Sequence, residues 1–195
     1  MKSKFLFFFL IALSTSCSSD YSPKPRGYFY IELPKPIYRD FVRYPFFKCS
    51  ISNQMIVKEL KNESQGGKKN SEIGFNLNYP RLHAQIFCSY RKIIPSDFLV
   101  LSETDRRTID ILKQKAKGVT EAAYSHPEQK VYGQMYEIQG NPVSPIQFVI
   151  SDSTHSYFKG ILYFDTVLDR DSIAPVLAYI TKDVQVMIES FQWKQ

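Results

Sequence analysis

The sequence predicts an α+β fold in which an antiparallel β-sheet is covered by helices on both faces, as a three-layer sandwich. Several segments alternate apolar and polar residues with the two-residue period of strands. Two longer segments repeat apolar residues at the three- and four-residue spacing of helices. One strand segment, 157–166, is apolar or aromatic in both phases, so we expect cover on both of its faces. Aromatic residues make up 15% of the 195 residues, which favours strands because flat rings pack well on a pleated surface.

Four strands are expected before the first helix, because each segment alternates apolar side chains with polar ones. They cover residues 28–33, 46–51, 75–79 and 82–90. Between the second and the third, Asn62–Ser71 contains two adjacent glycines and several charged residues. This composition indicates an exposed loop.

The apolar period then changes, and residues 97–123 predict a helix with a break near Gly118. Three strands follow at 130–139, 146–150 and 157–166. The last helix begins at Asp171 or Ser172, and its apolar stripe runs from Ile173 to Phe191. We place Lys182, Asp183, Gln185 and Glu189 on its polar side. The element order is similar to that of the Mog1/PsbP-type fold, an analogy that implies no shared activity.

The first 16 residues predict a secretory signal peptide. Lys2 and Lys4 give a positive start, Phe5–Leu13 is apolar, and Ser14, Thr15 and Ser16 are small. Cys17 follows directly, and its thiol is the group that would take a diacylglycerol. We therefore expect cleavage before Cys17 and lipidation of its side chain. The alternative is plain secretion, with Cys17 as an incidental thiol.

The predicted organisation is a signal peptide at 1–16, a lipidated tether at 17–27 and a single α+β domain at 28–195. Acyl chains contribute about 0.8 kcal/mol per buried CH₂, so several chains on one cysteine anchor a protein to a membrane. Ser18 and Ser19 beside the cysteine favour the outer membrane, and the inner membrane remains the alternative.

The sequence indicates no catalytic residues, no cofactor and no metal site. His83, His126 and His155 each lack a second ligand at metal-binding spacing. Asp152, Ser153 and His155 are triad residue types, but residues so close in sequence rarely converge, and we expect a turn there. The formal net charge of +6 is spread over isolated basic pairs, which together with export excludes a nucleic-acid partner.

Two thiols remain after lipidation, Cys49 and Cys88, and both lie in predicted strands. Neighbouring strands can bring two cysteines within bridging distance, and exported proteins often carry disulfides. The other interpretation is two reduced cysteines that pack in the core. The sequence leaves both interpretations open.

Several motifs match a known family, and they extend from the lipid cysteine nearly to the last residue. They include Cys17–Tyr21, Pro23–Phe29, Lys130–Gly133, Gly160–Phe164, Asp171–Val176 and Phe191–Trp193. On these residues the chain resembles the gliding-motility lipoprotein GldD family of Bacteroidota. The resemblance implies a required component of gliding motility and of the type IX secretion system, not a described enzyme.

Two functional hypotheses follow. The first is a membrane-tethered subunit that binds other proteins of the gliding and secretion machinery through an arm with Arg26, Tyr28 and Tyr30, residue types common at binding hot spots. The same tyrosines could instead pack on their own domain. The second is a periplasmic ligand-binding or hydrolytic lipoprotein, which requires polar groups that converge in a cleft.

Overall fold

The computed structural model describes residues 32–60, 72–140, 142–165 and 170–194. The predicted signal peptide, the lipidated tether and nearly all of the strand expected at 28–33 lie outside the described residues. So does the loop expected at Asn62–Ser71. Within the described part, neither helix is long and apolar enough to cross a membrane.

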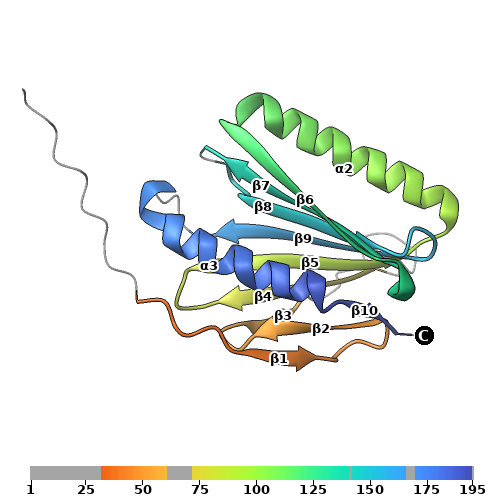
Figure 1. Cartoon of the computed structure of the whole chain (residues 1–195), viewed down its shortest axis with the longest axis horizontal. Helices are drawn as coiled ribbons and strands as arrows, with labels where there is room; N and C mark the ends of the chain where they lie inside the picture. The colour runs from red at the N-terminus through yellow and green to blue at the C-terminus, as the bar shows by residue number, and fades with distance from the viewer. Residues whose placement is uncertain (1–31, 61–71, 141, 166–169, 195) are drawn as a thin grey trace, which may run out of the picture.

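Two antiparallel sheets form the framework (Figure 1). The larger sheet has seven strands in the order β3-β4-β5-β9-β8-β7-β6, and the smaller sheet has three in the order β1-β2-β10. The strands of the larger sheet are β3 (Ile56–Glu59), β4 (Glu72–Tyr79), β5 (Ala84–Lys92), β6 (Gly118–His126), β7 (Val131–Gln139), β8 (Ile146–Ser151) and β9 (Ser156–Phe164). Those of the smaller sheet are β1 (Tyr38–Phe41), β2 (Phe47–Ser52) and β10 (Gln192–Trp193), and a short 3₁₀ helix, η2 (Pro127–Gln129), links β6 to β7.

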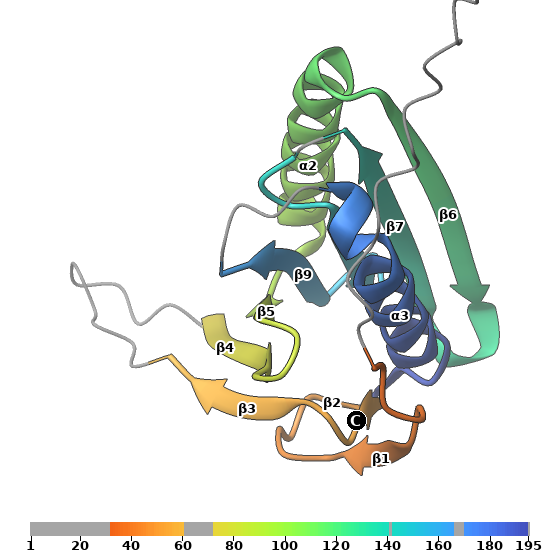
Figure 2. The ribbon, with the colours of Figure 1, turned by 90° about the vertical axis from the view of Figure 1, so that its left-hand side faces the viewer.

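Helix α3 (Arg170–Glu189) covers one face of the large sheet, and the small sheet lies beside it (Figures 1 and 2). The apolar stripe of α3 is buried, and Ile180, Val184 and Ile188 in it are fully inaccessible to solvent. Phe47 of β2 stacks on Phe191, which follows α3, at a ring-centroid distance of 5.2 Å. One hydrophobic cluster therefore joins α3 to strands of both sheets.

Helix α2 (Pro95–Lys115) packs on the opposite face of the large sheet. On β9, Tyr157 and Lys159 both contact Asp105 of α2, whereas Phe158 between them belongs to the α3-side core. Because side chains alternate across a strand, the two helices lie on different faces. Ile109 of α2 is buried on this side.

The described part of the chain is α+β, mostly antiparallel sheet with two helices, as the sequence predicts. The finer prediction of a complete three-layer sandwich is not confirmed. Helix α2 lies over β7, β8 and β9, whereas Gly74, Asn76 and Phe87 of β4 and β5 are partly exposed on the same face. The likeness to the Mog1/PsbP-type fold stays a prediction.

The prediction of a helix over residues 97–123 is wrong at its end. Helix α2 stops at Lys115, its C-cap Ala116 has extended backbone, and Gly118–His126 forms β6. Val119 and Ala123 fit a helical spacing, but they pair with Ile138 and Gln134 of β7 instead. Pairing along all nine residues of β6 outweighs the weak helical preference of this segment.

Glycine is required at position 160, at the centre of the large sheet. A Cβ atom there would lie 2.1 Å from Cζ of Phe148 on the neighbouring strand β8. Phe148 is buried and packs against Phe158, with ring centroids 6.1 Å apart. The missing side chain at Gly160 thus provides the space for an aromatic ring in the α3-side core.

Candidate functional site

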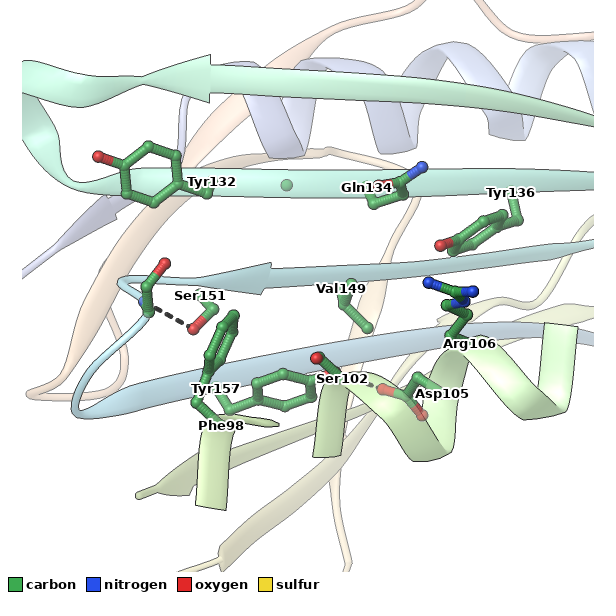
Figure 3. Close-up of a pocket in the computed structure, with 12 residues that line it drawn as sticks. Phe98, Ser102, Asp105, Arg106, Tyr132, Gln134, Tyr136, Val149, Ser151 and Tyr157 are labelled. Carbon is green, nitrogen blue, oxygen red and sulfur yellow. Dashed lines mark hydrogen bonds between the residues drawn. The ribbon is translucent and has the colours of Figure 1, made fainter. Parts of the chain in front are cut away.

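A groove of about 290 Å³ lies between α2 and the strands β7, β8 and β9 (Figure 3). We call it the α2 groove. Helix α2 supplies one wall with Phe98, Ser102, Asp105 and Arg106. The sheet supplies the rest with Tyr132, Gly133, Gln134, Tyr136, Val149, Ser151, Ser153 and Tyr157. The groove thus combines aromatic rings with hydroxyl, amide and charged groups.

A partly buried cluster of polar side chains fixes α2 to the sheet in the α2 groove. The hydroxyl of Tyr157 donates a hydrogen bond to one carboxylate oxygen of Asp105, and Nζ of Lys159 donates to the other. The side chains of Asp105 and Lys159 are 18% and 25% exposed. Burial and the neighbouring Asp105 raise the pKa of Tyr157, so the phenol stays protonated and remains a donor.

The basic side chains of α2 differ in their partners. Arg107 is paired with Glu103 at 3.2 Å, and Lys113 is paired with Glu121 of β6 at 2.5 Å. Within the described part of the chain, Arg106 has no ion pair or hydrogen bond from its guanidinium. Figure 3 shows this guanidinium on the side of α2 that faces Tyr136. Arg106 is therefore free to pair with an anion from outside.

The turn between β8 and β9 confirms the interpretation of Asp152, Ser153 and His155 as a hairpin. Oδ1 of Asp152 accepts hydrogen bonds from the backbone N–H groups of Thr154, His155 and Ser156, at 2.7–2.9 Å. Burial alone would raise the pKa of this carboxyl, but the three donors outweigh it and lower the pKa. Asp152 is thus used to hold the turn, and Ser153 adopts the left-handed backbone that the turn needs, with φ 66°.

The histidines lie apart from one another on the surface. Nδ1 of His155 is 2.9 Å from the hydroxyl of Thr154, and His83 is exposed at the β4–β5 turn. Nδ1 of His126, the last residue of β6, lies 3.9 Å from a carboxylate oxygen of Glu128 in η2. Among the described residues, no three His, Cys, Asp or Glu side chains are grouped so that they could hold a metal ion.

Cys49 of β2 and Cys88 of β5 are both free and buried in the structure. Burial raises the pKa of Cys49 to about 12. Burial and the proximity of Cys49 raise the pKa of Cys88 as well. Both thiols are thus protonated at neutral pH. In this reduced form they pack as small core residues. The disulfide between them stays a prediction from the sequence.

A buried carboxylate lies on α3 where the sequence places a polar, outward-facing residue, and that placement of Asp183 is wrong. Its side chain is fully inaccessible to solvent, and it accepts hydrogen bonds from Tyr38 and Tyr79, both at 2.9 Å. Burial raises the pKa of Asp183, and the two hydrogen bonds oppose that rise. The three residues join β1, β4 and α3, which is a structural role.

Other expected site residues lie outside the described part of the chain. These are the lipidation residue Cys17 and the arm residues Arg26, Tyr28 and Tyr30. The α2 groove, in contrast, was not predicted from the sequence. The helical pattern of α2 shows its apolar residues, but it does not show which strands Arg106 and Phe98 face.

A family model described as "Gliding motility lipoprotein GldD" matches residues 18–193. The chain belongs to this family. The match spans all but the last residue of the described domain and confirms the resemblance based on the sequence motifs. No match was found among curated proteins. As a member of the GldD lipoproteins, the chain is a lipid-anchored protein of the cell envelope that is associated with gliding motility.

Proposed function

We propose that this GldD-family chain acts as an interaction subunit of the gliding-motility and type IX secretion machinery. The match to the GldD family over residues 18–193 carries this proposal. In it, the lipid on Cys17 holds the domain at the membrane, and the domain acts by binding neighbouring proteins. Ser18 and Ser19 favour the outer membrane over the inner membrane.

The proposal assigns binding rather than catalysis to the domain. Asp152, the carboxylate nearest in sequence to Ser153 and His155, is occupied by three backbone N–H groups. A carboxylate that holds a turn in this way is a poor partner for orienting a catalytic histidine. The arm residues Arg26, Tyr28 and Tyr30 remain predicted contacts, since aromatic and arginine side chains dominate binding hot spots.

A periplasmic ligand-binding role is the second candidate, and the α2 groove favours it. The volume of about 290 Å³ is close to the lower end of the range for small-molecule sites. A small ligand that binds the purified protein tightly, without any partner protein, would support this alternative.

The test of the proposed function removes the lipid site. Cells that carry Cys17→Ala are compared with wild type and with a control, Ser19→Ala, which keeps the cysteine. We expect mass spectrometry to find acyl chains on the wild type and the control only. We also expect Cys17→Ala to leave the membrane fraction, to lose crosslinks to machinery proteins, and to impair gliding or secretion at an unchanged protein level.

Normal gliding and secretion by the unlipidated, detached variant would contradict the proposal. An unmodified Cys17 in the wild type would contradict it as well, because the tether would then be absent.

A further inference from the structure

We infer that the α2 groove binds an extended segment of a partner protein in which a carboxylate side chain stands next to a large apolar one. The inference rests on the interaction role proposed above, and it names the surface and the chemistry of the partner. It depends on three features of the groove: an apolar surface, a cation that has no partner among the described residues, and a neutralised carboxylate.

The apolar surface comes from both walls of the groove. Phe98 on α2 lies beside Tyr157 of β9 (Figure 3), and Tyr132 and Val149 line the groove from the sheet. Tyr132 is 41% exposed, so a large aromatic ring is accessible at the edge of the groove. In the same turn of α2, Leu99 is 68% exposed, so apolar surface continues beyond the groove. Aromatic side chains exposed in this way are typical anchors of protein–protein contacts.

The cation is Arg106. Its neighbour Arg107 has a partner in Glu103, and Lys159 across the groove has one in Asp105. The guanidinium of Arg106 has no such partner among the described residues. A guanidinium binds a carboxylate with two parallel hydrogen bonds, so it selects this group by shape as well as by charge.

The carboxylate of Asp105 does not cancel this attraction. Both of its oxygens accept hydrogen bonds, from Tyr157 and from the ammonium of Lys159. Glu121, which accepts a hydrogen bond from Gln134 of the groove, is paired with Lys113. Among the described residues that line the groove, Arg106 is then the charged side chain that has no partner. The groove is therefore complementary to a negatively charged partner.

The size of the groove favours a few side chains of a peptide over a larger ligand. A volume of about 290 Å³ is small for a cofactor but is sufficient for one or two side chains. Ser102 and Gln134 also line the groove, and their oxygen atoms are hydrogen-bond acceptors, whereas Nε2 of Gln134 already donates to Glu121. The hydroxyl of Ser151 is used within the β8–β9 turn. An extended segment can place an apolar residue against Phe98 and the adjacent carboxylate against Arg106.

The test uses the mature lipidated protein in detergent micelles and three probes. The probes are the capped tripeptides Leu-Asp-Phe and Leu-Asn-Phe, and inorganic phosphate. Binding is followed by NMR of isotope-labelled protein. We expect Leu-Asp-Phe to shift resonances of Tyr132 and Gln134 and to bind about tenfold more tightly than Leu-Asn-Phe, because only aspartate forms the charged pair.

The matched variants are Arg106→Gln and Arg107→Gln, which remove the same charge from adjacent residues. We expect Arg106→Gln to abolish the preference for Leu-Asp-Phe and Arg107→Gln to keep it. Equal binding of the two tripeptides, binding of neither, or an equal effect of both variants would overturn the inference. Equal shifts from phosphate would also overturn it, because they would indicate a plain anion site. None of these results would affect the lipid-anchor experiment, so the two proposals fail separately.

Discussion

At the scale of single residues, Asp183 shows how a charged side chain can be accommodated in a core. A carboxylate that is buried without a cation must receive hydrogen bonds, or its charged form is strongly disfavoured. Tyr38 and Tyr79 donate two of these bonds. Asp183 in turn contributes, after burial, to the raised pKa of both tyrosines, about 12 for Tyr38. Both phenols therefore stay protonated as donors throughout the neutral range.

The raised pKa of Asp183 predicts a pH dependence of stability. The folded chain holds this proton more tightly than the unfolded chain, whose carboxyl has the ordinary pKa of 3.8. The free energy that Asp183 contributes to folding is therefore fully present below pH 3.8. It is lost as the pH rises through the pKa that Asp183 has in the folded chain. Asp183→Asn removes the titration. We expect the free energy of unfolding of wild type, relative to Asp183→Asn, to fall as the pH increases from about 4 towards 7.

Urea unfolding of both proteins over this pH range measures the effect. The other carboxyl groups are common to the two proteins, so their contributions cancel in the difference. Two parallel profiles would show that Asp183 titrates normally in the folded chain.

At the scale of elements, the attachment of α2 to the sheet depends on a few contacts. The cluster of Asp105, Tyr157 and Lys159 is the main polar connection that we find between α2 and β9. In contrast, α3 is held by an extensive apolar stripe. We therefore expect α2 to open more readily than α3, because regions with less buried apolar area open locally at lower free energy.

Asp105→Asn tests this attachment. The change leaves the ammonium of Lys159 without its charged partner in a site that is only 25% exposed. We expect a loss of about 1–2 kcal/mol in the free energy of unfolding, below the value for a fully buried pair because of the partial exposure. Hydrogen exchange should become faster in α2 and stay unchanged in α3.

The control is Asp110→Asn, on the same helix. Asp110 is 52% exposed and lies 3.8 Å from Lys113, so its removal should change stability by about 0.5 kcal/mol or less. If both variants behave alike, the cluster in the α2 groove does not hold the helix.

The elements also show what the sequence can and cannot predict. The strands β4 and β5 and helix α3 could be predicted because each segment has a regular apolar period. Strand β9 could be predicted too, although its segment is apolar or aromatic in both phases. The end of α2 could not be predicted from apolar period, because the spacing of Val119 and Ala123 also fits a helix. These residues form a strand because they pair with β7, and that pairing is not visible in the local sequence. The α2 groove depends on contacts between Asp105 and residues about 50 positions later, which no local pattern contains.

At the scale of the whole molecule, the C-terminal residues join the two sheets. Trp193 in β10 pairs with Phe47 of the small sheet, and its ring lies 6.4 Å from that of Tyr90 in the large sheet. Its indole N–H donates to the carbonyl of Lys130, which precedes β7. The described domain therefore has a continuous core, and we expect it to unfold as one cooperative unit.

Trp193 is the single tryptophan of the chain, so its fluorescence reports on this junction alone. We expect the urea midpoint from tryptophan fluorescence to coincide with the midpoint from far-ultraviolet circular dichroism, which reports on all strands and both helices. A tryptophan transition at lower urea would mean that the small sheet separates before the large sheet unfolds. Coincidence would mean that any partner bound to either sheet stabilises the whole domain, because a ligand of the folded state adds its binding free energy to the cooperative unit that contains its site.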